Sequence, residues 1–216
     1  MSMITVPADV VLRKPVPRRN VSADAILSVT RKIIGEQGLA GAQARPIAEA
    51  SGCSVGTLYN VFDSLDTLIL RVNAQTLGEF HEQARSALER AVATGQLPVE
   101  RLIALANAYV DFAEANTLRW SAVFEFRRPV EDEVPKWYSD QIDSMFALVE
   151  ESIAGLAGIK DQTMRVEIAR ALWASVHGIV SLAFARRIGP IVPSNVRHHV
   201  EIMVRAAWAG FDARPA

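Results

Sequence analysis

Hydrophobic residues recur every three or four positions along most of this chain. In residues 64–88 the apolar side chains follow the 3.6-residue period of an α-helix over several turns. After the first 20 residues, no segment shows the two-residue alternation that is typical of a half-buried β-strand. The pattern predicts an all-α protein.

Three short helices are predicted near the N-terminus. The first begins after Ser22, which suits an N-cap, and ends at Gly38, because glycine favours helix termination. The second covers about residues 44–51 and the third about residues 54–61. Gly52 separates these two helices.

Longer helices are predicted in the rest of the chain. One begins near Ser64 and forms a natural bridge between two domains. Five more follow, at about residues 98–115, 118–126, 135–156, 162–187 and 194–211. With 216 residues, half of them hydrophobic, the chain can bury a sizeable core. We therefore expect about nine helices.

Two short helices joined through Ser51-Gly52-Cys53-Ser54 have the dimensions of a helix-turn-helix, whose second helix enters the DNA major groove. In that helix we expect Leu58, Val61 and Phe62 to face the core. The outward side chains are short, apart from Tyr59, whose phenol can reach a phosphate. The residues expected to contact DNA are Arg45, Ser54, Val55, Gly56, Thr57, Tyr59 and Asn60. The alternative is a helix–glycine–helix corner without a nucleic acid partner.

The charge distribution favours an anionic partner at the N-terminal end. The net charge is −1, but residues 1–62 hold seven Lys or Arg against four Asp or Glu, which leaves −4 for the rest. Residues 1–20, which contain three prolines, are predicted to form a flexible basic arm. In this arm Arg18 and Arg19 are expected to attract DNA.

Residues 45–69, RPIAEASGCSVGTLYNVFDSLDTLI, resemble the signature of the TetR family of bacterial transcriptional repressors. The resemblance is strong over about residues 22–70 and weak in sequence afterwards. The matching residues are Ile47, Ala48, Gly52, Ser54, Gly56, Thr57, Leu58, Tyr59, Phe62 and Leu68. The resemblance implies a DNA-binding domain at residues 21–68 and a ligand-binding and dimerisation domain at residues 69–216. It also implies a homodimer that binds a palindromic operator and is released by a ligand.

Two positions depart from the family pattern. Leu65 stands where the family usually has a Lys that contacts the DNA backbone, and Gln43-Ala44 stands where a Thr or Ser usually caps the second helix. Both departures are expected to weaken phosphate anchoring, which the basic arm can offset.

An effector pocket is expected among the body helices. Trp173, His177 and Gly178 resemble a Trp-x-x-x-His-Gly element found in one TetR subgroup, and a spacing of four places Trp173 and His177 on one helix face. The candidate lining residues are Phe112, Trp120, Phe124, Trp137, Met145, Trp173 and His177. Such a lining suits a small, mostly apolar molecule. The alternative is that these residues are ordinary core.

The last two helices, at about residues 162–187 and 194–211, are candidates for the homodimer interface. The first is apolar nearly all round and carries small residues that allow close helix approach. A dimer also matters for function, because its two DNA-binding domains must lie about one DNA turn apart to bind a palindrome. The alternative is that both helices pack only within the monomer.

Enzyme, metal and membrane functions find little support in the sequence. It lacks a phosphate-binding glycine loop, a His-Glu-x-x-His zinc motif and the carboxylate–histidine spacing of di-iron proteins. We expect no metal and no cofactor. The single cysteine, Cys53, and the lack of a long uninterrupted apolar run favour a cytoplasmic protein that does not span a membrane. A helical small-molecule-binding protein or enzyme that does not read DNA is the alternative function, suggested by Leu65 and the missing cap.

Overall fold

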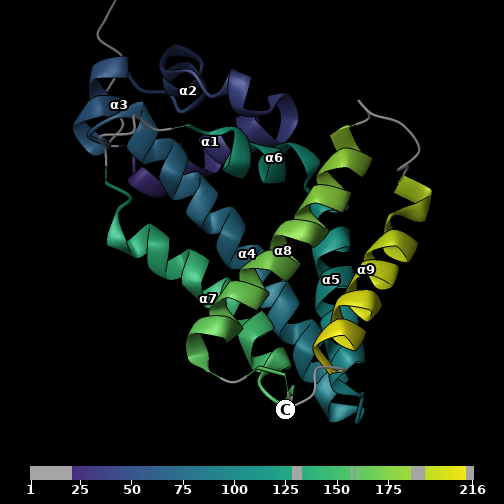
Figure 1. Cartoon of the computed structure of the whole chain (residues 1–216). Coiled ribbons are helices and arrows are strands. Elements are labelled where there is room, and N and C mark those ends of the chain that lie inside the picture. Colours follow the sequence, from purple (N-terminus) through teal and green to yellow (C-terminus); the bar gives the residue numbers. More distant parts are fainter. Residues whose placement is uncertain (1–20, 128–132, 157, 160, 186–192, 213–216) are drawn as a thin grey trace, which may run out of the picture.

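The computed structural model describes residues 21–127, 133–156, 158–159, 161–185 and 193–212. Within these residues it contains nine α-helices, two short 3-10 helices and no strand, which confirms the all-α prediction (Figure 1). The α-helices are α1 (Ala23–Gln37), α2 (Ala44–Ala50), α3 (Val55–Val61), α4 (Leu65–Ala93), α5 (Pro98–Ala115), α6 (Thr117–Glu125), α7 (Lys136–Ile153), α8 (Gln162–Ala185) and α9 (Val196–Asp212).

Helices α1, α2 and α3 form a small N-terminal head around its own hydrophobic core. Ser22 caps α1 as predicted, because its hydroxyl accepts a hydrogen bond from Ala25 N at 3.2 Å. Gly38 ends the helix with a φ of 71°. The prediction for Val61 was wrong: this residue is 38% exposed, whereas Leu58 and Phe62 are buried. The last turn of a seven-residue helix therefore shows Val61 to solvent.

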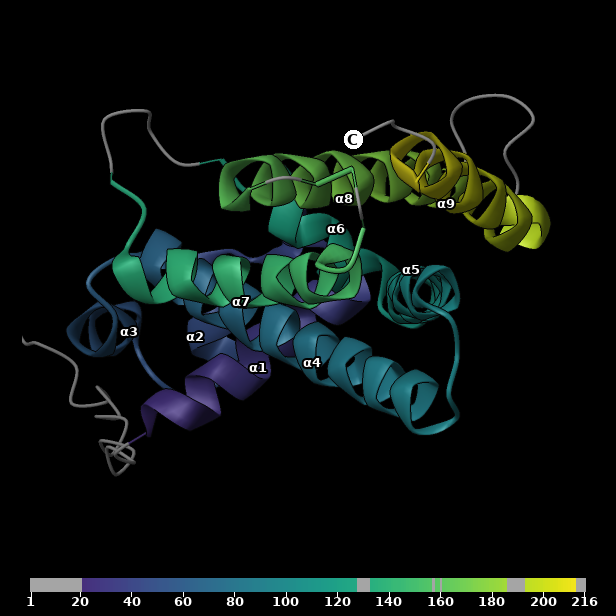
Figure 2. The same cartoon turned by 60° about the horizontal axis from the view of Figure 1, so that its bottom comes forward.

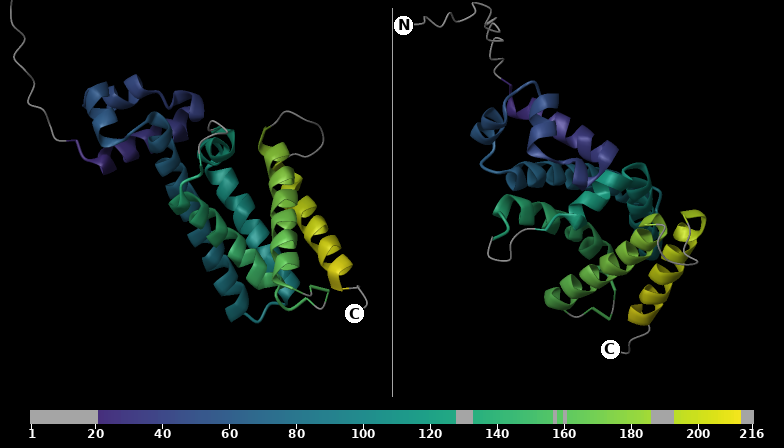
Figure 3. Two further views of the ribbon diagram at one scale, coloured as in Figure 1. Left: turned by 60° about the vertical axis from the view of Figure 1, so that its left-hand side comes forward. Right: turned by 90° about the horizontal axis from the view of Figure 1, so that it is seen from above.

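Helix α4 joins the head to the body. Ser64 caps it, with its hydroxyl accepting a hydrogen bond from Thr67 N at 3.0 Å. Its first turns contribute Leu68 and Val72 to the head core, and later turns contribute Leu77 and Phe80 to the body core. Figure 3 shows α4 leaving the head and running the length of the body. The helix therefore belongs to both cores, as expected of a bridge.

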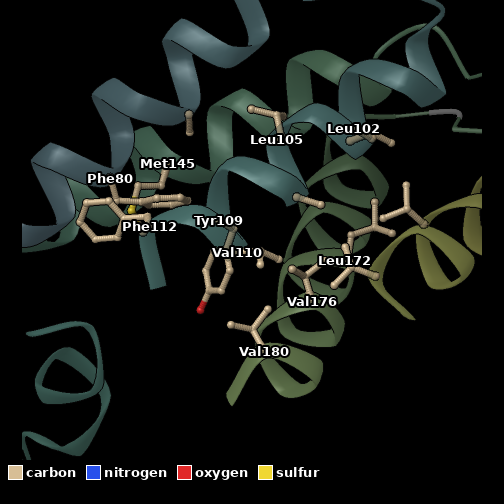
Figure 4. Packing of buried hydrophobic residues seen from close by; sticks show 14 of the residues in the cluster. Phe80, Leu102, Leu105, Tyr109, Val110, Phe112, Met145, Leu172, Val176 and Val180 are labelled. Carbon is tan, nitrogen blue, oxygen red and sulfur yellow. The ribbon is translucent and has the colours of Figure 1, made fainter. Parts of the chain in front are cut away.

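The body packs α5, α7, α8 and α9 around the second half of α4. Its core is a single cluster of buried apolar side chains drawn from all of these helices. Figure 4 shows part of it, with Phe80, Phe112 and Met145 close together and Leu102, Leu105 and Leu172 further along the core. Helices α8 and α9 lie side by side as an outer layer of the body (Figure 2).

Helix α6 lies in the C-terminal half of the sequence but packs into the head. Its Ala122 is fully buried in the head core, and Asn73 Nδ2 of α4 donates a hydrogen bond to the Ala122 carbonyl at 3.4 Å. Glu79 of α4 also bridges two arginines, Arg31 of α1 at 2.6 Å and Arg119 of α6 at 2.9 Å. These contacts attach α6 to the head.

Candidate functional site

The turn between α2 and α3 has the backbone geometry of a tight helix-turn-helix corner. Gly52 lies at a φ of 68°, in the left-handed region that favours glycine, and Cys53 N donates a hydrogen bond to the Ala48 carbonyl at 3.0 Å. Ser54 then caps α3, because its hydroxyl accepts a hydrogen bond from Thr57 N at 3.0 Å and lies 2.9 Å from the Thr57 hydroxyl. The cap fixes the direction of α3.

Helix α3 shows solvent a small surface of mixed polar and apolar groups. Val55 and Tyr59 are 37% and 44% exposed, and Gly56 and Asn60 are exposed beside them. Leu58, on the opposite side, is completely buried in the head core. The predicted contact residues Val55, Gly56, Tyr59 and Asn60 therefore share one exposed face. Ser54 and Thr57 lie at its start, where their hydroxyls form the cap.

The flanking residues are placed less favourably for binding an anion. Gln43 precedes α2 without a side-chain capping bond, as expected from the sequence. Arg45 is exposed, but its Nε lies 3.3 Å from Glu49 Oε1. Leu65 is half-buried and packs against the head core. Arg18 and Arg19 lie outside the described residues.

Three neighbouring cavities lie among the body helices. The first, of about 60 Å³, is almost entirely apolar, and the second, of about 380 Å³, opens beside it. Met145 and Trp173 belong to the walls of both. The third, of about 270 Å³, lies between α5, α6 and α8 and is more polar, with Ser121, Glu125 and His177 in its wall. Phe124 separates the second cavity from the third, since it lines both.

The structure brings most of the predicted pocket residues to these cavities. Met145 and Trp173 line the first two, and Trp120, Phe124 and His177 line the third. Phe112 packs in the core against Phe80 and Trp120 instead. The guanidinium of Arg71 lies over the ring of Trp137, with Arg71 Cζ 4.2 Å from the ring centre. Neither Phe112 nor Trp137 lines any of the three cavities.

Tyr109 is the pocket residue that sequence reasoning missed. Its side chain lines the first cavity, and Figure 4 shows its hydroxyl pointing away from Leu102 and Leu105. Trp120 Nε1 donates a hydrogen bond to this hydroxyl at 2.8 Å, and His177 Nδ1 lies 2.6 Å from it. These two hydrogen bonds form a Trp120–Tyr109–His177 relay, which connects α6, α5 and α8. A lone tyrosine in an apolar helix carries no sequence signal for such a role.

The relay has one arrangement in which every donor has an acceptor. An indole N–H only donates, so Tyr109 Oη accepts from Trp120 and its own proton is directed to His177 Nδ1. His177 is then neutral, with its proton on Nε2, which lies 3.1 Å from Ser181 Oγ. Burial favours the same state, because it lowers the pKa of His177. Burial also raises the pKa of Tyr109, which keeps its phenol protonated.

Aromatic rings enclose His177. Trp173 stacks on it with ring centres 5.1 Å apart and planes 8° from parallel, which confirms that the two residues share one helix face. Phe124 covers it at 4.2 Å. The residues that the structure describes contain no group of three or more His, Cys, Asp or Glu side chains that could hold a metal ion.

Two family models match the chain. The model for bacterial regulatory proteins of the tetR family matches residues 26–72, which cover the head, and the model for the tetracyclin repressor-like C-terminal domain matches residues 102–207. Together they span most of the chain, and the exposed face of α3 falls within the first. The chain belongs to the TetR family. It is a DNA-binding transcriptional regulator with a three-helix head and a helical C-terminal domain.

Three solved structures are similar to this regulator over nearly their whole length. A protein of unknown function from Rhodococcus sp. RHA1 is 21% identical, with a TM-score of 0.67, and the match covers 93% of this chain and 100% of that one. The regulator FadR from Bacillus subtilis, in complex with stearoyl-CoA, is 14% identical with a TM-score of 0.64, covering 85% and 98%. The repressor FadR from Thermus thermophilus, in complex with lauroyl-CoA, is 18% identical with a TM-score of 0.63, covering 90% and 97%. No curated protein matches the sequence.

One described helix of this TetR-family protein is long and apolar enough, by length and composition alone, to cross a membrane. It covers residues Gln162–Phe184 of α8, and 28% of its most apolar window is buried within the monomer. Exposed positions along it include Ala171, Ala174 and Leu182. Helix α8 is therefore an apolar helix that the monomer covers only in part.

Proposed function

We propose that this regulator is a homodimeric repressor that binds a palindromic operator through α3 and leaves it when a small apolar effector enters the body. The observation that carries the proposal is the exposed face of α3, which is held by the Ser54 cap within a family-matched head. Val55, Gly56, Tyr59 and Asn60 suit a helix that approaches base edges closely, since their side chains are short apart from Tyr59. Tyr59 reaches a phosphate and positions the helix.

The dimer forms through the outer layer of α8 and α9. Small exposed residues such as Ala171 and Ala174 let two α8 helices approach closely, and an added Cβ at Gly178 meets no atom within 4 Å. On α9, Ile202 is 52% exposed. An apolar surface of this kind is expected to be covered by a second copy of the chain. As a DNA-binding regulator, the dimer acts in the cytoplasm.

The effector occupies the first two cavities, whose walls are apolar. Two structurally similar regulators were solved with stearoyl-CoA and lauroyl-CoA, which supports an elongated apolar ligand here as well. The narrow first cavity must widen to admit such a molecule. Its wall includes Tyr109, so widening disturbs the relay to Trp120 on α6, and α6 is fixed to the head. Release requires that the effector bind the altered conformer more tightly than the DNA-bound one.

Selection of bound sequences from a random duplex pool tests this function. Purified protein at near-physiological salt is expected to enrich one palindrome, and Asn60→Ala is expected to enrich it less, with its fold intact because Asn60 is exposed. Glu151→Ala, an exposed change near the end of α7 and outside the proposed dimer and DNA surfaces, serves as a control that keeps wild-type enrichment. Recovery of no motif by the wild type would contradict the proposal and favour a helical binder or enzyme that does not read DNA.

A further inference from the structure

The first cavity lies among five helices of the body. Its volume is about 60 Å³, and its wall comes from α4, α5, α7, α8 and α9. Residues four apart on a helix share one face, so Ala84 faces this space together with Phe80 on α4, and Ala106 does so together with Leu102 on α5. The wall therefore contains two small side chains beside much larger ones.

The described residues of this wall offer the cavity no hydrogen-bonding side chain. None of them is charged. Among them only Tyr109 has a hydroxyl, and that group is engaged by Trp120 and His177. Trp173 Nε1 has almost no accessible surface, so it presents no donor there. A polar group placed in this cavity would lose its hydrogen bonds to water without replacement.

The apolar wall indicates what fills the cavity. Protein interiors contain few voids larger than a water molecule, and a void lined by apolar side chains excludes water but takes up hydrocarbon. An engineered cavity of about 150 Å³ with such a wall binds benzene. At about 60 Å³ the first cavity is smaller, so it suits the narrow end of a hydrocarbon chain rather than a ring or a whole effector.

Ala84 and Ala106 keep the cavity open. Both are buried in the body core, 3% and 7% exposed. Each contributes a single methyl group to the wall, and a leucine at either position would extend its branched end into the space. The size of these two residues therefore limits how much of a chain can enter.

We propose that the first cavity receives the unsubstituted end of a hydrocarbon chain of the effector, and that Ala84 and Ala106 are specificity-determining residues that set the length of chain it accepts. The polar group of the effector lies outside this cavity. A chain with a polar group at its far end is rejected. This inference rests on the proposed effector site and adds which end of the effector enters the first cavity and what limits its length.

Three alcohols test the inference: 1-hexanol, 1-octanol and 1,8-octanediol. They are titrated into the full-length protein labelled with ¹³C in its methionine methyl groups, and the resonance of Met145, which lines the cavity, reports binding. Met145→Leu identifies that resonance. The wild type is expected to bind 1-octanol about tenfold tighter than 1-hexanol, since each buried methylene contributes roughly fourfold. It is expected to bind 1,8-octanediol about tenfold more weakly than 1-octanol, because one hydroxyl is then buried without a partner.

Ala84→Leu and Ala106→Leu shorten the cavity from two different helices. Each variant is expected to bind 1-octanol about tenfold more weakly than the wild type, as the loss of about two buried methylenes predicts. Each is expected to bind 1-hexanol within about twofold of the wild type, because a shorter chain still fits the space that remains. Ala104→Leu is the matched control: it is the same change on α5, but Ala104 lines a separate hollow between α4 and α5, and wild-type affinities are expected.

Three results would overturn this inference alone: wild-type affinity for 1-octanol in the folded cavity variants, an equal loss for 1-hexanol and 1-octanol, or equal binding of 1-octanol and 1,8-octanediol by the wild type. Thermal unfolding shows which variants keep the fold, and the comparison of 1-octanol with 1,8-octanediol needs neither of them. If none of the three alcohols shifts the Met145 resonance, the effector site itself is overturned.

Discussion

Tyr109 Oη lies 2.6 Å from His177 Nδ1 and, on its other side, accepts a hydrogen bond from Trp120. This pair joins α5 to α8, and Trp120 extends the connection to α6, which packs in the head core through Ala122. The relay therefore lies between the DNA-binding head and the two apolar cavities in which we propose that the effector binds. Its stability and protonation can be tested without knowledge of either ligand.

Removal of the Tyr109 hydroxyl is expected to destabilise the protein. Tyr109→Phe leaves Trp120 Nε1 and His177 Nδ1 without their partner, at a cost of about 1–3 kcal/mol, or several degrees in Tm for a chain of this size. Thermal unfolding measures the effect. Tyr138→Phe is the control: Tyr138 is also buried, but its hydroxyl makes no hydrogen bond within the described residues, and a small change is expected. Equal losses in both variants would contradict the relay.

His177 is expected to make stability fall in mild acid. Its pKa in the folded protein is lowered by burial, so below the ordinary value of 6.5 the unfolded chain binds more protons than the folded one. The contribution is therefore present above about pH 6.5 and is lost as pH falls toward the lowered pKa. Tyr109 contacts the ring and stays protonated throughout this window, because burial raises the pKa of its phenol.

Comparison of Tm between pH 7.5 and 5.5 for wild type and His177→Gln isolates this residue from the other three histidines. The wild type is expected to lose more stability than the variant over that interval. A variant with the same slope as the wild type would show that His177 does not carry the pH dependence.

Gly56 offers a test of how closely α3 approaches DNA. An added Cβ there meets only Ser54 Oγ, at an ordinary 3.7 Å, and alanine favours a helix over glycine by about 1 kcal/mol. Gly56→Ala is therefore expected to keep or raise Tm while weakening operator affinity about tenfold or more, because the methyl group separates the helix from the groove. Unchanged affinity would place Gly56 outside the interface.

Gly78→Ala is the matched control for that variant. Gly78 lies within α4 and an added Cβ meets only Gln141 Nε2, at 3.6 Å. The same gain in helix propensity is expected there, with no effect on DNA affinity.

Glu79 is expected to hold the head and α6 together. Glu79→Gln weakens the bridge to Arg31 and Arg119, and the Arg119 side chain is only 14% exposed, so a loss of about 1 kcal/mol is expected at low salt. The loss should shrink at high salt, because screening already weakens the wild-type pairs. Glu82→Gln, which changes an exposed pair with Arg85 within α4, is expected to leave Tm unchanged. Similar effects of both variants would contradict the bridging role of Glu79.

The sequence predicted the helices well because their signals are local. Ser22, Ser54 and Ser64 cap three helices through bonds to residues three positions later, and such spacings are visible in the chain. The packing of α6 into the head was not predicted, since Asn73 and Ala122 are 49 residues apart and no local pattern joins them. Val61 was predicted to face the core but is exposed, because a hydrophobic pattern over only seven residues does not define which side of α3 is buried at its last turn.

In the candidate pocket, too, local relationships were predicted and contacts between distant residues were not. Trp173 and His177 were paired correctly from their spacing on one helix. Tyr109, which contacts His177 and lines the first cavity together with Trp173, was missed because its hydrogen-bond partners come from α6 and α8. Its role depends on the packing of three helices.

The measurement that tests the central claim most directly is the affinity of the protein for its selected palindrome, compared with the same duplex carrying one scrambled half-site. We expect two chains per palindrome, a loss of roughly 100-fold or more on scrambling one half-site, and affinity that falls steeply with salt. Equal affinity for both duplexes at every salt concentration would contradict a dimeric regulator that reads a palindrome through α3.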